Sequence, residues 1–377
     1  MTRKAITGAD IFDGRILHQG AALLLKGDVF ESICAEEEIP STYHRHRVDG
    51  GTIMPGFVDL QVNGGGGVMF NDDTSVAGLR TIADAHAATG TQAFLPTLIT
   101  DTAERTKAAI DAVAAAIDAG VPGIVGLHLE GPHIAVAKKG AHDPALIRPM
   151  TATDETIVLD AVARLPNVMI TVAPESVTHA QIEKLGTAGA IVALGHTDCS
   201  FAEAQKAFAA GTSCVTHLFN AMSQLGSRSP GLVGAALATR GIAAGLIADN
   251  IHVHAASIQI ALDAMDPTDL FLVTDAMASV GSNITGFQLN GREVRRADGC
   301  LRLEDGTLAG ADLTMPRALS VLLAETNVSR ERAFAMATFV PAHLLKDALG
   351  HGAFTRGQPA HAIHLDPDCV YRGALAV

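Results

Sequence analysis

Residues 91–130 read TQAFLPTLITDTAERTKAAIDAVAAAIDAGVPGIVGLHLE. Two apolar, β-rich runs at 91–99 and 123–130 flank an alanine-rich segment at 103–120, whose pattern indicates a helix that ends at Gly120. A strand, a helix and a strand in this order predict a βα unit with parallel strands. The fold class therefore depends on how often the unit recurs.

The unit recurs along most of the chain. Helix-like segments such as 75–90, 153–165 and 201–211 separate most of the apolar runs. The eight runs lie at 52–62, 91–99, 123–130, 168–173, 190–196, 213–218, 243–248 and 270–275. Eight βα units predict an α/β fold with a (β/α)8 TIM-type barrel. A doubly wound sheet is the competing fold, but it would usually carry a glycine-rich fingerprint at its first turn.

Both ends of the chain are rich in short strands and turn residues instead of βα units. We expect residues 1–53 and 350–377 to pair into one small, discontinuous β-sandwich domain, with the barrel at 54–349. Within the barrel, FQLNGREVRRADGCLRLEDGTLAG (287–310) reads as a β-hairpin or meander inserted after the eighth strand, near the barrel mouth.

Composition excludes several classes of protein. The 377 residues hold 27 Lys and Arg against 40 Asp and Glu, a net charge of −13 with no basic run, so we expect no nucleic-acid partner. No stretch approaches the roughly 18 apolar residues of a membrane span, and the start has no apolar signal-like region. Five cysteines without a CxxC pair favour free thiols in a reducing, cytoplasmic compartment.

Polar side chains that are costly to bury follow several predicted strands, and the carboxyl ends of barrel strands are where active sites form. These residues are Gln61, Asn63, Glu130, His196, His217 and Asp275. One carboxylate and two imidazoles suit zinc or a similar divalent ion, with a position left for water. A single histidine at a strand end is more often a hydrogen-bonded structural residue than a metal ligand, so the prediction depends on the whole set.

Longer motifs narrow the interpretation. The segments are PGFVDLQVNGGGGVMFND (55–72), GLHLEGPHIAVAKKGAHDP (126–144), LGHTDCSFAEA (194–204), THLFNAM (216–222), RSPGLVGAAL (228–237), IADNIHVH (247–254), LVTDAM (272–277) and LAGADLTM (308–315). In this order, over nearly the whole chain, they resemble the N-acetylglucosamine-6-phosphate deacetylases of the amidohydrolase superfamily. That resemblance also implies a barrel with a discontinuous β-sandwich.

The resemblance implies a role for each matching residue. Glu130, His196 and His217 correspond to the ligands of one divalent metal per subunit, zinc in the first place, with iron, cobalt or manganese as alternatives. Asp275 corresponds to the general acid and base. His142 corresponds to a residue that contacts the substrate near its acetyl group or a sugar hydroxyl.

Four further residues match the family's contacts with the sugar phosphate: Asn220, Ala221, Arg228 and His252. In the family the arginine reaches the neighbouring subunit's site, so the resemblance implies a homodimer. The planar guanidinium of Arg228 can form two hydrogen bonds to a phosphate, and it supplies positive charge that an acidic protein otherwise lacks. Lys138 and Lys139 are interpreted as solvated loop charges outside the site.

The first strand departs from a frequent amidohydrolase pattern. Many members end this strand with His-x-His, which holds a second metal, whereas this chain has Gln61-Val62-Asn63. A neutral amide is a poor zinc ligand. We therefore expect one metal, with Gln61 at most at a weak second position.

The expected reaction is hydrolysis of the acetamide of N-acetylglucosamine 6-phosphate to glucosamine 6-phosphate and acetate, in amino-sugar catabolism or recycling. Alternatives are the galacto epimer as substrate, another amidohydrolase reaction, and a barrel that senses sugar phosphates without catalysis. Intact acidic and imidazole groups at four strand ends argue against the sensor.

Overall fold

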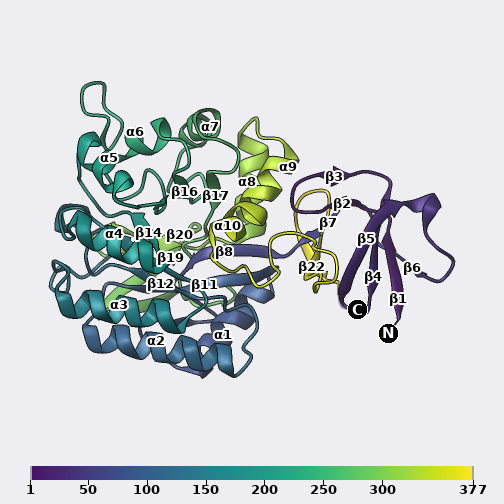
Figure 1. Ribbon diagram of the computed structural model, residues 1–377, viewed down its shortest axis with the longest axis horizontal. Helices are drawn as coiled ribbons and strands as arrows, with labels where there is room; N and C mark the ends of the chain where they lie inside the picture. The colour runs from purple at the N-terminus through teal and green to yellow at the C-terminus, as the bar shows by residue number, and fades with distance from the viewer. Residues whose placement is uncertain (1, 376–377) are drawn as a thin grey trace.

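The computed structural model describes residues 2–375 and shows two bodies, a large α/β barrel and a smaller β domain (Figure 1). Eight parallel strands form the barrel wall in sequence order. They are β8 (Phe57–Val62), β11 (Thr91–Ile99), β12 (Leu127–Glu130), β13 (Val168–Val172), β14 (Ile191–Leu194), β15 (Cys214–Val215), β16 (Ala243–Leu246) and β17 (Leu270–Leu272). The predicted (β/α)8 barrel is confirmed.

Helices cover the outside of the strands (Figure 1). They are α1 (Val76–Ala87), α2 (Ala103–Asp118), α3 (Ala152–Arg164), α4 (His179–Ala188), α5 (Phe201–Ala209), α6 (Gly231–Ala238), α7 (Ala255–Ala264), α8 (Met315–Glu325), α9 (Arg330–Ala337) and α10 (Phe339–Leu344). Ser or Thr side chains cap several N-termini; Thr102, for example, accepts the Arg105 amide at the start of α2. Apolar faces of these helices pack on the strands and form one continuous core.

Residues from both ends of the chain build the small domain, as predicted. One sheet has the order β5-β4-β1-β6 and the other β23-β22-β7-β2-β3. The strands are β1 (Arg3–Thr7), β2 (Asp10–Phe12), β3 (Leu17–His18), β4 (Ala21–Lys26), β5 (Val29–Ala35), β6 (His44–Arg47), β7 (Thr52–Pro55), β22 (Ala362–Leu365) and β23 (Tyr371–Ala374). The C-terminal β22 lies antiparallel to β7, so the two chain ends share a sheet.

The predicted first barrel strand, 52–62, is two strands. Residues Thr52–Pro55 pair with β22 and β2 in the small domain, and only Phe57–Val62 enters the barrel. The chain passes from one sheet to the other at Gly56, where an added Cβ would lie 2.1 Å from the Gln92 side chain. Continuous apolar character concealed this break, because both strands are buried.

An antiparallel meander follows the eighth strand, as the sequence predicts. It consists of β18 (Gly286–Leu289), β19 (Arg292–Ala297), β20 (Cys300–Leu303) and β21 (Leu308–Ala311). A short hairpin, β9 (Gly64–Gly65) with β10 (Val68–Met69), leaves the first barrel strand. Two 3-10 turns complete the described elements, η1 (Glu36–Glu38) and η2 (Val136–Lys138).

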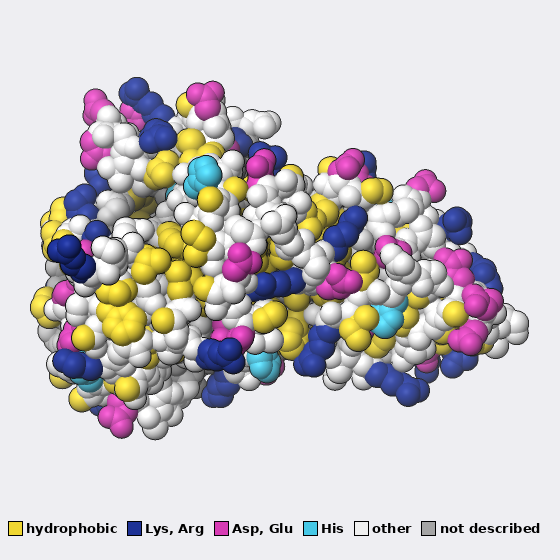
Figure 2. All heavy atoms as spheres, turned by 90° about the horizontal axis from the view of Figure 1, so that it is seen from above, with side chains coloured by type: hydrophobic (Ala, Val, Ile, Leu, Met, Phe, Trp, Pro, Cys, Tyr) yellow, Lys and Arg dark blue, Asp and Glu magenta, His cyan; other side chains and the backbone are white. Residues whose placement is uncertain are grey.

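The surface carries both signs of charge. On the face in Figure 2, Lys and Arg side chains alternate with Asp and Glu over both bodies. Among residues 2–375, no helix is long and apolar enough to cross a membrane.

Candidate active site

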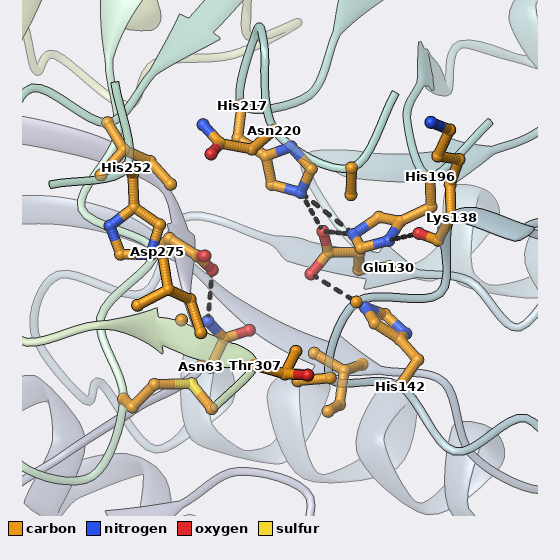
Figure 3. Close-up of a pocket in the computed structure, with 18 of the residues that line it drawn as sticks. Asn63, Glu130, Lys138, His142, His196, His217, Asn220, His252, Asp275 and Thr307 are labelled. Atoms are coloured by element: carbon orange, nitrogen blue, oxygen red, sulfur yellow. Dashed lines mark hydrogen bonds and ion pairs between the residues drawn. The ribbon is translucent and has the colours of Figure 1, made fainter. Parts of the chain in front are cut away.

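The strand-end residues singled out in the sequence converge at one end of the barrel (Figure 3). Glu130 is the last residue of β12, while His196, His217 and Asp275 follow β14, β15 and β17 by two or three residues. All three of the latter have positive φ angles of 48°, 29° and 51°. Such backbone strain in non-glycine residues costs free energy and concentrates at functional sites.

Glu130 lies at the centre of a tight cluster of donors. Its Oε1 lies 3.1 Å from Nε2 of His196 and 3.0 Å from Nε2 of His217. The two imidazole nitrogens are themselves 3.0 Å apart. Because all three side chains are almost completely buried, these atoms meet away from solvent.

This geometry fits a divalent metal. Ligands about 2.1 Å from a tetrahedral ion lie about 3.4 Å from one another, close to the spacing of these three atoms. The nearby imidazoles hold the pKa of Glu130 well below its usual range despite burial, and Glu130 raises the pKa of His217. A carboxylate with two imidazoles is a donor set that zinc accepts, and similar first-row ions accept it too.

His196 is oriented from outside the cluster. Its Nδ1 lies 2.8 Å from the backbone oxygen of Lys138, which fixes the ring so that Nε2 faces Glu130. The Lys138 ammonium pairs with Asp198 at 3.2 Å, and the residue lines the cavity. The interpretation of Lys138 as a loop charge outside the site is therefore wrong.

His142 approaches the same cluster from the loop after η2. Its Nε2 lies 4.0 Å from Glu130 Oε2, and Glu130, His142 and His196 together form a group whose ligand atoms lie within 4.8 Å of one another. Nδ1 of His142 contacts the Thr100 hydroxyl at 2.7 Å and accepts the Thr100 amide at 3.4 Å. Burial lowers the pKa of His142 to about 3, so the ring is neutral and Nε2 carries the proton.

Asp275 faces the cluster from the opposite side. Asn63 donates to its Oδ1 at 2.7 Å, and Gln61 donates from Nε2 to the same oxygen and to Glu130 Oε1, both at 3.1 Å. Burial, with the charge of Glu130, raises the pKa of Asp275 to about 6. Gln61 thus bridges two carboxylates as a donor. Its Nε2 faces the site, which does not favour Gln61 as a ligand in a weak second metal position.

The cavity extends from this cluster towards the residues matched to substrate contacts. Asn220, Ala221 and His252 line it, together with Thr307 and Leu308 of the meander region. His252 is held by Asp249, whose Oδ2 lies 2.6 Å from Nδ1. Nε2 of His252 is buried and has no hydrogen-bond partner within residues 2–375. The sequence interpretation did not include Thr307, which a loop of the meander brings to the cavity. It also did not include Thr100 and Asp249, although they follow β11 and β16 by one and three residues.

Arg228 is the exception among the predicted site residues. It is exposed on the loop before α6 and does not line the cavity of its own chain. Within a single chain the structure therefore does not bring Arg228 to the cluster.

The chain has close relatives of known activity. The sequence model described as "Amidohydrolase family" matches residues 52–374. An N-acetylgalactosamine-6-phosphate deacetylase of Shewanella sp. (strain ANA-3) is 42% identical, with 94% of this chain and 93% of the relative covered. An N-acetylglucosamine-6-phosphate deacetylase of Haemophilus influenzae is 30% identical, covering 92% and 91%.

The chain belongs to the amidohydrolase family.

A solved structure supports this assignment over both domains. The crystal structure of N-acetylglucosamine-6-phosphate deacetylase from Pasteurella multocida superposes with a TM-score of 0.94 at 32% identity, covering 99% of this chain and 98% of the other. The amidohydrolase fold thus includes the small β domain of this chain. The family is metal-dependent, which agrees with the cluster around Glu130.

Proposed function

We propose that the chain hydrolyses the acetamide of N-acetylhexosamine 6-phosphates, releasing acetate and the amino-sugar phosphate. One observation carries the proposal: the buried cluster of Glu130, His196 and His217 faces a strained aspartate across a cavity. The far wall of this cavity holds an imidazole nitrogen with no hydrogen-bond partner within residues 2–375. A metal held by the cluster could activate water for amide hydrolysis. The free imidazole nitrogen of His252 could donate a hydrogen bond to an anionic group of the substrate. Relatives over more than nine-tenths of the chain are named as deacetylases of two such sugar phosphates.

Glu130, His196 and His217 would hold one divalent metal per subunit, and we propose zinc. Bound there, the ion would lower the pKa of a water molecule towards about 7 and polarise the amide carbonyl. Iron, cobalt and manganese accept the same donors, so the metal available in the cell decides among them.

Asp275 serves as the proton carrier in this proposal. It accepts a proton from the water oxygen as that oxygen bonds to the carbonyl carbon. It then delivers the proton to the sugar nitrogen as the C–N bond breaks, so that the nitrogen leaves as an amine. Burial raises the pKa of Asp275, which favours a carboxyl group that can hold a proton, and the Asn63 amide bonds to Oδ1 and fixes the orientation of the carboxylate.

His142 serves as a hydrogen-bond donor in this proposal. As a neutral ring with its proton on Nε2, it can donate to the carbonyl oxygen when negative charge develops there. Thr100 holds the opposite nitrogen, so the ring needs no rearrangement during the reaction.

The phosphate end is assigned to His252, Asn220 and Ala221, with the partner subunit's Arg228 closing the site in a homodimer. The free Nε2 of His252 supports the first assignment. Three exposed apolar side chains lie within four residues in sequence of cavity residues: Val136 at 55% exposure, Leu225 at 57% and Ile251 at 40%. An arginine fork from a second subunit would supply the missing positive charge.

The sequence motifs favour N-acetylglucosamine 6-phosphate as the substrate, with its galacto epimer as the alternative. The 42% identity to the Shewanella galacto deacetylase, against 30% to the Haemophilus gluco deacetylase, favours the galacto epimer as an equally good substrate. We also propose a cytoplasmic location, since all five cysteines are free thiols and sugar phosphates are intracellular metabolites.

The test is acetate release by purified protein from both epimers, each with and without the 6-phosphate. The proposal predicts turnover of the phosphorylated sugars and at least a ten-fold loss of kcat/KM without phosphate, about 1.4 kcal/mol or more of lost binding. Equal turnover of the unphosphorylated sugars would contradict the phosphate assignment, and no acetate from any of the four would contradict the reaction.

A further inference from the structure

A buried carboxylate lies beneath the active site with no ion-pair partner. Asp59 in β8 is 0% exposed, and none of the ion pairs within residues 2–375 includes it. Its hydrogen-bond donors are the Thr274 hydroxyl, the Thr274 amide at 3.3 Å and the Gln61 amide at 3.2 Å. Burying a carboxylate without a cation is costly, so its presence calls for a physical reason.

Asp59 and Thr274 lie where the barrel closes. Within residues 2–375 no ladder joins β8 to β17, the first and last strands. At the strand ends the backbone contacts across this seam are a single bridge between Val62 and Ala276 and the amides of Asn63 and Gly64, which donate to Ala276 at 2.8 and 3.1 Å. Beyond the strand ends, the amides of Gly66 and Gly67 donate to Val280 and Ala278 at 2.7 and 2.8 Å. The Asp59 side chain thus supplies hydrogen bonds where the seam has few backbone pairs.

The residue that follows Thr274 is Asp275, which has a φ of 51°. A strained backbone conformation persists when the surrounding structure fixes it, and here residues on both sides of Asp275 are held. On one side, Thr274 is tied to Asp59. On the other, the Ala276 amide donates to the Thr274 hydroxyl at 3.2 Å, so that one hydroxyl connects both flanking residues.

We propose that Asp59 and Thr274 form a positioning pair that holds Asp275 in its strained conformation, with its carboxylate aimed at the reacting amide. This inference rests on the proposed function, because it assigns a purpose to the placement of Asp275. Neither Asp59 nor Thr274 lines the cavity, so both act through Asp275 and touch no substrate.

Three substitutions separate positioning from general stabilisation. Thr274→Val keeps the side-chain shape and removes the hydroxyl, and Thr274→Ser keeps the hydroxyl. Asp59→Asn keeps the acceptor for both backbone amides, because Gln61 and Thr274 donate to the same oxygen, Oδ1. It places an NH2 group where Oδ2 accepts the Thr274 hydroxyl. In Asp59→Asn the contact with Thr274 can therefore persist only with the NH2 group as donor, as a neutral bond in place of the bond to the carboxylate.

The measurements are kcat and KM for acetate release from N-acetylglucosamine 6-phosphate and N-acetylgalactosamine 6-phosphate, with metal content per chain. Thr274→Val should lose kcat by on the order of a hundred-fold, the effect of a misplaced reacting group, with KM and metal unchanged. Thr274→Ser should stay within about three-fold of wild type, and Asp59→Asn should lie between the two. A Thr274→Val enzyme with the kcat of Thr274→Ser, or with kcat and metal lost together, would overturn the proposal.

The positioning role can also be tested if a variant fails to fold or if wild type shows no turnover. If Thr274→Val does not fold, the kcat of Asp59→Asn tests the proposal in its place. If neither variant folds, the pair serves to close the barrel and the proposal that it positions Asp275 is wrong. A crystal structure of Thr274→Val provides a readout independent of turnover: Asp275 should leave the positive-φ region. If wild type releases no acetate, the proposed function fails, while this structure still tests the positioning pair.

Discussion

Nε2 of His196 lies 3.0 Å from Nε2 of His217, and both nitrogens lie within hydrogen-bond distance of the same oxygen of Glu130. One oxygen can accept from both rings, but the two ring nitrogens cannot satisfy each other unless one is unprotonated. A cation at the common focus of the three atoms satisfies all of them at once. This relationship is the basis of the proposed metal site.

Removing one imidazole should therefore remove the metal. His217→Gln is expected to weaken metal binding by more than about ten-fold, because a ligand contributes at least as much as the outer partners of ligands do. Elemental analysis after dialysis against a chelator measures the effect. The matched control is His46→Gln on exposed β6 in the small domain, and equal metal content in both variants would contradict the site.

His142 should affect the chemical step and leave the metal in place. Loss of its donor in His142→Asn is expected to lower kcat by about 10²- to 10³-fold, as for other oxyanion donors. The control is His133→Asn on the same loop, whose ring contacts the Arg148 backbone oxygen and does not line the cavity. A fall in metal content equal to that in His217→Gln would make His142 a ligand instead.

The exposed position of Arg228 leads to a complementation experiment. Arg228→Ala and Asp275→Asn should each be nearly inactive alone, for different reasons. A hybrid of one chain of each has one site with both residues intact, so random mixing in a two-fold symmetric dimer should restore about a quarter of wild-type activity. Activity that stays at the level of the separate variants would place Arg228 in its own subunit's site or outside any site.

The junction between the two domains should make stability depend on pH. His351 stacks on His361 at 4.1 Å, and burial lowers the pKa of His351 to about 4. Below about pH 6.5, His351 binds a proton in the unfolded chain but stays neutral in the folded chain until the pH approaches 4. The free energy of unfolding should therefore fall between pH 6.5 and 4, by at most about 1.4 kcal/mol per pH unit.

His351→Phe keeps the stacking and removes this titration. In urea unfolding of metal-free protein at pH 7 and pH 5, the midpoint of the variant should shift less than that of wild type. Equal shifts in both proteins would show that His351 is protonated in the folded state at these pH values.

Sequence reasoning found the residues whose position follows from strand ends. Glu130, His196, His217 and Asp275 could be predicted because polar groups at the end of a buried strand are costly unless they have a function. Asn63, just beyond the end of β8, is among these strand-end candidates, and in the structure its amide donates to Asp275.

Residues that reach the site through loops could not be predicted in this way. Lys138 orients His196 with its backbone oxygen, a role that any residue type can perform and no side chain signals. Thr100 and Asp249, which contact His142 and His252, follow β11 and β16 by one and three residues, so the strand-end rule could have found them. The division of 52–62 into two strands was hidden for another reason, since burial on both sides leaves no alternation to mark the boundary.

The central claim is metal-dependent deacetylation with Asp275 as the proton carrier. The most direct test is acetate release from both N-acetylhexosamine 6-phosphates by wild type and Asp275→Asn, with metal content measured on the same samples. The account predicts turnover with about one metal per wild-type chain, and a loss of about 10²- to 10⁴-fold in kcat in the variant with its metal retained. Undiminished turnover in Asp275→Asn, or metal-loaded wild type that releases no acetate, would contradict it.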